Sequence, residues 1–131
     1  MYREGLYEIM LTRRSIRRYR PDPVGRELID RLLNAAIWAP SAHNRQPWRF
    51  CVIDTPEQIE ALARAMGARL RSDLERDGLD AEAIEKDTAR SYARITCAPV
   101  LIVLSLSMVD MDRYPDEQRN RDEYIMAVQS T

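Results

Sequence analysis

The sequence predicts an α+β domain, on the evidence of its length, its composition and the spacing of its apolar residues. The chain has 131 residues, of which 45% are hydrophobic and 31% are charged. This length suits one domain of common size, and the apolar share suits a chain that has a core. Apolar residues recur at helical spacing in about five segments, whereas only two segments have the composition of strands. Because a two-stranded sheet is marginal by itself, the pattern is typical of part of an α+β domain.

The first third of the chain predicts two helices joined by a basic segment and a turn. Apolar residues at helical spacing predict a short helix over 7–12. The basic run RRSIRRYR over 13–20 leads into PDPVG, a turn, because each proline fixes its own φ and restricts the residue before it. A second helix is expected from Arg26 to about Trp38, where Pro40 stops it.

The remainder predicts two strands and three helices. Trp48–Ile53 (WRFCVI) is rich in aromatic and β-branched residues, and Val100–Leu106 (VLIVLSL) is an apolar run typical of a buried strand. Between them, Thr55 followed by Pro56 predicts a long capped helix, and Asp80 caps another. Residues 122–131 have helical character.

The composition excludes several classes of protein. Cys51 and Cys97 lie far apart and in no CxxC, so we expect reduced thiols in a cytoplasmic protein, without a disulfide framework or a thiolate zinc site. His43 is the single histidine, which excludes a multi-histidine metal site. The longest apolar stretch, 98–104, is far shorter than the ~20 residues that span a bilayer, so no membrane is expected as a partner. We interpret two acidic pairs as solvated rather than metal-binding: Asp110 with Asp112, and Asp116 with Glu117.

Charge is distributed unevenly along the chain. The formal net charge is −1, and nineteen of the twenty basic residues are arginine. Residues 1–54 hold ten arginines and six acids, a net charge of +4, whereas residues 55–131 carry a net charge of −5. Arginine presents a planar fork of donors that suits phosphate and carboxylate, although a genome rich in G and C gives the same bias without any function. We therefore look for ligand chemistry first in the basic N-terminal part.

The basic run contains a candidate phosphate site. In an extended segment Arg13, Ser15 and Arg17 point to the same side, because side chains alternate. Two guanidinium groups and a hydroxyl can then donate hydrogen bonds to one phosphate. A solvated basic face or a nucleic-acid contact is the alternative, but no RNP-type aromatic pattern or helix-turn-helix spacing accompanies the run, and we expect no nucleic-acid partner. Neither G-x-G-x-x-G nor G-x-x-x-x-G-K-[ST] occurs in the chain.

Residues 39–48, APSAHNRQPW, form the second candidate segment. The amides of Asn44 and Gln46 both donate and accept hydrogen bonds, as recognition of an amide-rich heterocycle requires. A plain connection from helix to strand is the alternative. Ser41 and His43 are two residues apart on a loop and do not readily form a nucleophile–base pair, so a hydrolase is set aside.

Taken in order, RRSIRRY and then APSAHNRQPWRF resemble the N-terminal signature of the FMN-dependent nitroreductase family. In that family R-[RH]-S-x-[RK] is followed by P-S-x-x-N-x-Q-P-W-x-F, with a helix between them. The segments APVLIVLSLS and YPDEQRNRDEYIMAVQS are also similar to members of the family, including the branch related to the flavin-like domain of deazaflavin-cofactor biosynthesis. The resemblance runs from Tyr7 onward. It implies a nitroreductase-like α+β fold with a central mixed or antiparallel sheet flanked by helices.

The resemblance also implies a flavin site and an oxidoreductase activity. NAD(P)H would reduce FMN by hydride transfer, and a nitroaromatic, quinone or related small-molecule acceptor would be reduced in a second half-reaction. Because the flavin carries the chemistry, neither a catalytic residue nor a metal ion is expected. The basic segment would hold the FMN phosphate and ribityl chain, and the loop would reach the flavin across a homodimer interface. The implied cofactor-binding residues are Arg13, Arg14, Ser15, Arg17, Pro40, Ser41, Ala42, Asn44 and Gln46.

Compared with the family, residues 1–131 are expected to form a single nitroreductase-like domain that is incomplete at its C-terminus. Two alternatives to a reductase are a non-catalytic flavin- or deazaflavin-binding module and an inactive truncated relative. A third is the flavin-destroying oxygenase that makes the lower ligand of cobalamin, although Asn44 fits the reductase pattern better.

Overall fold

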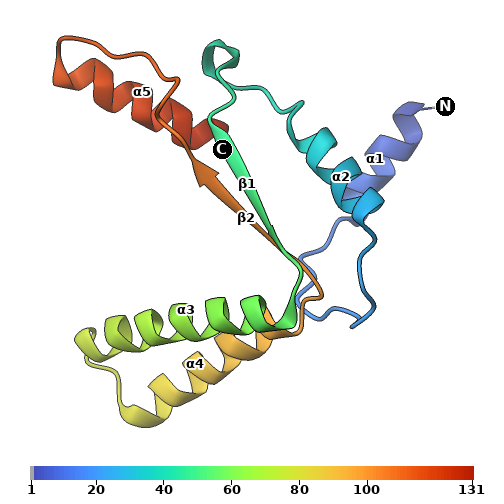
Figure 1. Ribbon diagram of the computed structural model, residues 1–131, viewed down its shortest axis with the longest axis vertical. Coiled ribbons are helices and arrows are strands. Elements are labelled where there is room, and N and C mark those ends of the chain that lie inside the picture. Colours follow the sequence, from blue (N-terminus) through green and yellow to red (C-terminus); the bar gives the residue numbers. More distant parts are fainter. Residues whose placement is uncertain (1) are drawn as a thin grey trace.

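A computed structural model describes the backbone of residues 2–131 and the side chains from Gly5 onward. The two strands run through the middle of the molecule, with one pair of helices at one end, another helix at the other end, and the first two helices to one side (Figure 1). The fold is α+β, as the sequence predicts. Its elements in chain order are α1 (Tyr2–Thr12), α2 (Arg26–Ala36), the 3-10 helix η1 (Ala42–Asn44), β1 (Trp48–Ile53), α3 (Pro56–Arg76), α4 (Ala81–Thr96), β2 (Leu101–Leu106) and α5 (Glu117–Ser130).

The sheet brings together two loops that are far apart in the sequence. β1 pairs antiparallel with β2, so that Trp48 lies opposite Leu106 and Ile53 opposite Leu101. The pairing continues past the strand ends, because the amide of Ser107 donates to the carbonyl of Pro47 at 2.7 Å. The loop that precedes β1 therefore lies beside the loop that follows β2.

α3 and α4 form a helical hairpin between the two strands in sequence and beyond one end of them in space (Figure 1). The turn between the helices uses Gly78 at a φ of 80°, a left-handed conformation that glycine adopts without steric cost. As predicted, the Asp80 side chain caps α4 by accepting the amide of Ala83 at 2.9 Å. Thr55 precedes α3 as expected, but its side chain makes no capping hydrogen bond.

The structure corrects three other details of the sequence prediction. The first helix begins at Tyr2 rather than at residue 7, and α2 ends at Ala36, slightly before the predicted end. The last helix begins at Glu117 rather than at residue 122, because the Asp116 carboxylate accepts the amide of Arg119 and caps the helix there. The main-chain N–H and then the guanidinium of Arg119 hold the pKa of Asp116 below its usual value.

The second strand was expected to be buried, and in this chain it is not. The side chains of Ile102, Val103 and Leu104 are each about two-fifths exposed. Strand composition predicts the extended backbone, whereas burial depends on which elements cover the strand.

Much apolar surface is left uncovered. The chain exposes 10808 Å², whereas a compact monomer of its mass exposes roughly 7,100 Å². None of the helices within the described residues is both long and apolar enough to cross a membrane. Exposed large apolar side chains lie on several elements, among them Leu6, Ile9 and Met10 on α1, Leu28 and Leu32 on α2, and Tyr124, Ile125, Met126 and Val128 on α5.

Candidate functional site

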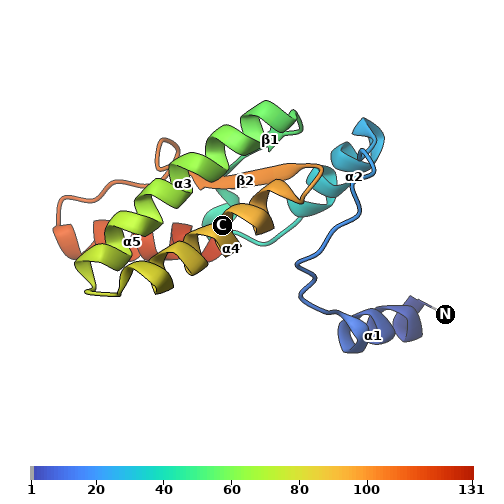
Figure 2. The same cartoon turned by 90° about the horizontal axis from the view of Figure 1, so that it is seen from below.

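The basic segment joins α1 to α2 and belongs to no helix or strand (Figure 2). Among residues 5–131, the side chains of Arg13, Ser15 and Arg17 have no hydrogen-bond or ion-pair partner, and all three residues are exposed. Arg14 differs, because its Nη1 donates to the carbonyl oxygens of Leu11 at 3.1 Å and of Arg13 at 2.9 Å. Three of the four predicted phosphate-binding residues thus have donors available to a ligand.

The second predicted segment is a loop with an unusual backbone. His43, Asn44 and Gln46 all have positive φ values, of 51°, 52° and 49°. For residues other than glycine this left-handed conformation costs roughly 1–2 kcal/mol each, although asparagine tolerates it better than most. Three such residues within four positions require contacts that hold the loop in place.

Part of that support comes from the predicted residues themselves. Ser41 Oγ accepts the backbone amide of Gln46 at 3.0 Å, and Gln46 Nε2 donates to the carbonyl of Ile37 at 3.3 Å. The amide of Ala42 donates to Ser130 Oγ at the end of α5, at 3.3 Å. Asn44, by contrast, is exposed, and its side-chain amide has no hydrogen-bond partner in the described part of the chain. Ser41 and Gln46 therefore shape the loop, whereas Asn44 presents a free amide.

A second set of contacts ties the loop to the segment after β2. Arg45 Nη2 lies 2.6 Å from Asp112 Oδ1, and Arg49 Nη2 lies 3.1 Å from Asp110 Oδ2. The amide of Asp112 donates to Oε1 of Glu123 on α5 at 3.3 Å, and Glu123 is only 3% exposed. Both carboxylates remain partly exposed to solvent, and in addition each pairs with an arginine, which the sequence interpretation did not include.

Sequence reasoning missed these supporting residues, although a signal for them was present. In an antiparallel pair, residues before the first strand lie beside residues after the second. Arg45 precedes β1 and Arg49 is its second residue, while Asp110 and Asp112 follow β2, so their opposite charges could have been matched once the strands were paired. Within the described residues, no cluster of three or more acidic, histidine or cysteine side chains is placed to hold a metal ion.

The loop and α5 form a shallow, open hollow of about 270 Å³. Pro40, Ser41 and Ala42 line one side of it, and Met126, Gln129 and Ser130 line the other. This volume lies slightly below the range of roughly 300–1,000 Å³ usual for small-molecule pockets. The cavity therefore accounts for only part of a cofactor site.

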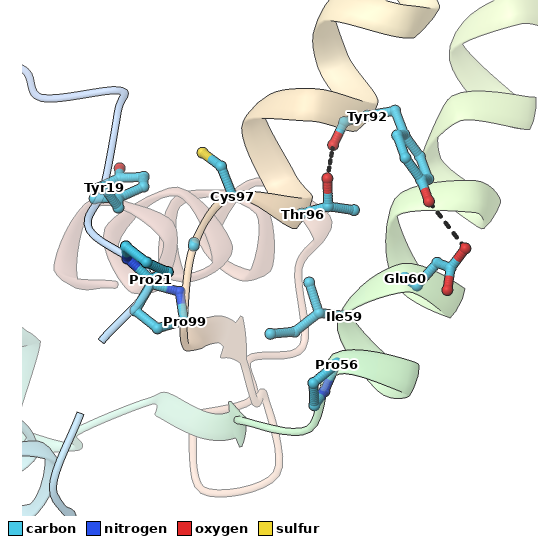
Figure 3. A pocket seen from close by; sticks show the side chains of 10 residues that line it. Tyr19, Pro21, Pro56, Ile59, Glu60, Tyr92, Thr96, Cys97 and Pro99 are labelled. Carbon is cyan, nitrogen blue, oxygen red and sulfur yellow. Dashed lines mark hydrogen bonds between the residues drawn. The ribbon is translucent and has the colours of Figure 1, made fainter. Parts of the chain in front are cut away.

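A larger cavity, of about 530 Å³, lies where the chain after the basic run passes the base of the α3/α4 hairpin (Figure 3). Tyr19, Glu60 and Tyr92 are among its lining residues, and none of the predicted cofactor-binding residues is. The Tyr92 hydroxyl donates to Glu60 Oε1 at 2.9 Å, and the Tyr19 hydroxyl donates to the Ile16 carbonyl at 3.0 Å. Both tyrosine hydroxyls of this lining thus already donate to oxygens of the chain itself.

The titratable groups at that cavity influence one another's pKa values. Hydrogen bonds from Arg64 and then from Tyr92 hold the pKa of Glu60 below its usual value. The hydrogen bond to Glu60 in turn raises the pKa of Tyr92 above its usual value. Arg64 also lies over the Tyr92 ring, 5.6 Å from its centroid. These contacts join α3 to α4.

Within one chain the two predicted segments do not form a single site. The basic segment and the loop around η1 lie apart in both views of the molecule (Figures 1 and 2). Among residues 5–131 no hydrogen bond or ion pair joins them. One chain therefore offers two separate candidate half-sites: a group of free cationic donors, and a strained loop that presents an amide.

Comparison with known proteins defines the family of this chain. The Nitroreductase family matches residues 10–130, and the chain belongs to it. An NADH dehydrogenase of Thermus thermophilus is 36% identical over 107 residues, which cover 82% of this chain and 41% of that protein. A 5,6-dimethylbenzimidazole synthase of Rhodobacter capsulatus is 39% identical over 83 residues, which cover 63% of this chain and 40% of that protein.

Solved structures give the same family. A nitroreductase from Desulfovibrio desulfuricans, solved in complex with FMN, superposes with a TM-score of 0.56 at 28% identity. The match covers 95% of this chain and 58% of that one. The chain thus spans about two-fifths of the length of the curated relatives named above, and somewhat more than half of the solved structure.

Proposed function

We propose that this protein is an FMN-dependent oxidoreductase that uses NAD(P)H to reduce a small-molecule acceptor such as a nitroaromatic or a quinone. Membership of the nitroreductase family supports an oxidoreductase. The observation that carries the flavin proposal is that the side chains of Arg13, Ser15 and Arg17 have free hydrogen-bond donors. The unpaired side-chain amide of Asn44, on a loop held by contacts of its own residues, adds to it.

The residues present fit FMN. Exposed guanidinium groups and a hydroxyl without other partners suit a phosphate, and an amide that both donates and accepts suits the edge of the flavin ring. In the proposal Arg13, Arg14, Ser15 and Arg17 bind the phosphate and ribityl chain, while Pro40, Ala42 and Asn44 face the flavin, and Ser41 and Gln46 shape the loop. FMN, when bound, supplies the hydride-transfer chemistry, so that the protein's part is binding and orientation.

The proposal includes a homodimer with the flavin at its interface. Its support is the separation of the two half-sites within one chain and the apolar surface left exposed on α5, where Tyr124, Ile125 and Val128 are each more than two-fifths exposed. The two exposed free cysteines support a cytoplasmic location.

Flavin content, reduction and assembly test the proposal together. Purified protein incubated with FMN and desalted is expected to be yellow, to lose its flavin absorbance anaerobically with NADH or NADPH, and to regain it with a quinone. Light scattering should give twice the mass of one chain. Mixing Arg17→Ala protein with Asn44→Ala protein should restore FMN binding in part, because each mixed dimer contains one intact composite site. A chain that cannot retain FMN, at any protein concentration up to that used for light scattering, would refute the proposal.

A second candidate is favoured by one comparison. The Rhodobacter capsulatus relative is a 5,6-dimethylbenzimidazole synthase and is 39% identical over its match to this chain. If this chain shares that activity, reduced FMN should be consumed irreversibly in air. Reversible bleaching and recovery of the same flavin would favour the reductase instead.

A further inference from the structure

The loop over 40–47 depends on side chains outside the predicted cofactor-binding set. Arg45 stands between two left-handed residues, Asn44 and Gln46, and its guanidinium reaches across to Asp112 at 2.6 Å. The two side chains are 41% and 36% exposed, so the pair is neither buried nor fully solvated. It links positions that are 67 residues apart in the sequence.

Asp112 is itself fixed in place. Its main-chain amide donates to the carboxylate of Glu123, which is nearly completely buried on α5. The neighbouring residue Met111 is also buried, at 6% exposure. Asp112 therefore presents its carboxylate from a well-anchored part of the chain, whereas Arg45 belongs to the strained loop.

A surface ion pair of this kind contributes little to the stability of a whole fold, because solvent screens it and ordering two side chains costs entropy. Its effect on a local conformation can be larger, because left-handed non-glycine residues persist only where their surroundings fix them. The uncharged supports of the loop are the Ser41–Gln46 contact inside it, the bond from Gln46 Nε2 to the Ile37 carbonyl and the bond from the Ala42 amide to Ser130. Arg49, which pairs with Asp110, adds a charged donor to the Gln46 carbonyl at 3.3 Å. The Arg45–Asp112 pair is the ion pair made from within the turn over 43–46 itself.

We infer that Arg45 and Asp112 are positioning residues of the flavin site: their ion pair, anchored through Glu123, holds the left-handed turn over 43–46 so that the Asn44 amide faces the ligand. The identity of the ligand rests on the proposed function. The effect of the pair on the loop does not, because it is a property of the protein alone.

The first test measures the loop without flavin. Asp112→Asn keeps the size of the side chain and its main-chain amide, but removes the charge. Hydrogen exchange of the Arg45 and Gln46 amides, which donate to Ala42 O and Ser41 Oγ, is expected to become at least fivefold faster. Exchange in α3 and α4 should be unchanged, which distinguishes local loosening from global unfolding. The matched control is Asp87→Asn, which removes an ion pair of the same length, with Arg90, far from the loop in sequence.

The second test measures FMN binding by quenching of flavin fluorescence. Asp112→Asn is expected to weaken binding at least fivefold, and Asp87→Asn to leave it within twofold. The charge-swapped double variant Arg45→Asp/Asp112→Arg should recover at least half of the lost affinity and protection, since the pair is restored with its partners exchanged. If Arg45 and Asp112 act separately rather than through their ion pair, the double variant gives no such recovery, and the inference is overturned.

The outcomes separate the two proposals. Unchanged loop exchange in Asp112→Asn overturns the inference, and so does a loosened loop with unchanged FMN affinity. Failure of the unmodified protein to bind FMN refutes the proposed function and the orientation of Asn44 toward flavin, while the exchange data still decide whether the ion pair holds the loop.

Discussion

Replacing Arg17 by alanine tests most directly whether the basic segment binds the FMN phosphate. Arg17 is exposed and its side chain has no partner among residues 5–131, so its removal leaves no unpaired group and should not change the stability of the fold. Any loss of FMN affinity would therefore come from a lost contact with the ligand.

The size of the loss follows from the character of that contact. A hydrogen bond between charged groups contributes about 1.5–3 kcal/mol, and an exposed site favours the lower end because water competes. A loss of about 1.5 kcal/mol corresponds to roughly tenfold weaker binding. Arg14→Ala should cost less than Arg17→Ala, because the Arg14 guanidinium is already bonded to the carbonyl oxygens of Leu11 and Arg13.

Arg18→Ala is the matched control, because Arg18 is equally exposed and is adjacent to Arg17 in the same run. Side-chain alternation in an extended segment directs Arg18 away from the phosphate. The FMN affinity of the Arg18→Ala variant should therefore stay within twofold of that of the unmodified protein. The assay is titration of apoprotein with FMN at constant ionic strength, with urea unfolding as the check on stability. Equal losses for Arg17→Ala and Arg18→Ala would show that the run acts as a diffuse positive surface, and would refute the assignment of particular residues.

Two further predictions concern contacts in the α3/α4 hairpin. Asp80→Ala should lower the free energy of unfolding in urea by about 1 kcal/mol, because it removes a helix cap that is formed. Thr55→Ala should lower it by only a few tenths of that amount, because Thr55 makes no capping hydrogen bond. Equal losses for the two variants would contradict this distinction. Tyr92→Phe should raise the pKa of Glu60 toward its usual value of 4.5 in an NMR titration, although not fully, because the larger effect comes from Arg64. Because folding lowers the pKa of Glu60, the ionised Glu60 carboxylate stabilises the fold above about pH 4.5, and this stabilisation is lost as the pH falls through the folded-state pKa. The difference in unfolding free energy between Tyr92→Phe and the unmodified protein should therefore narrow in acid.

The elements that sequence predicted best are those whose signals are local. β1 has the predicted bounds, Trp48–Ile53, because a run of aromatic and β-branched residues favours an extended backbone wherever it lies. The Asp80 cap is likewise as predicted. Thr55 shows the limit of such signals, because the residue type and position are right but the side-chain hydrogen bond is not formed.

What the sequence could not predict depends on residues distant along the chain. The apolar run of β2 predicts the strand, but whether Val103 is buried depends on what covers that face of the sheet. The pairing of Arg45 with Asp112 depends on the register of β1 and β2, which places the two loops side by side. The motif thus identified the residues with free donors and two residues that shape the loop, Ser41 and Gln46, but not the ion pair of Arg45 with Asp112.

The two places where the chain turns left-handed illustrate different demands on the same backbone conformation. Between α3 and α4 the chain uses Gly78, which relieves steric cost where only a turn is needed. In the loop before β1 the chain uses Asn44, with His43 and Gln46 nearby also at positive φ, although glycine would adopt this conformation more easily. Departures from local preference of this kind are expected where a side chain has a function.

Asn44→Gly separates these two demands. Glycine adopts the same φ without cost, so the free energy of unfolding should stay constant or rise by up to about 1 kcal/mol. The amide is lost at the same time, so FMN affinity should fall by at least fivefold, with Gly78→Ala as a contrasting variant that loses stability at its φ of 80° and keeps its FMN affinity. If Asn44→Gly bound FMN as well as the unmodified protein, the loop would contribute its shape alone, and the amide of Asn44 would have no part in recognising the flavin.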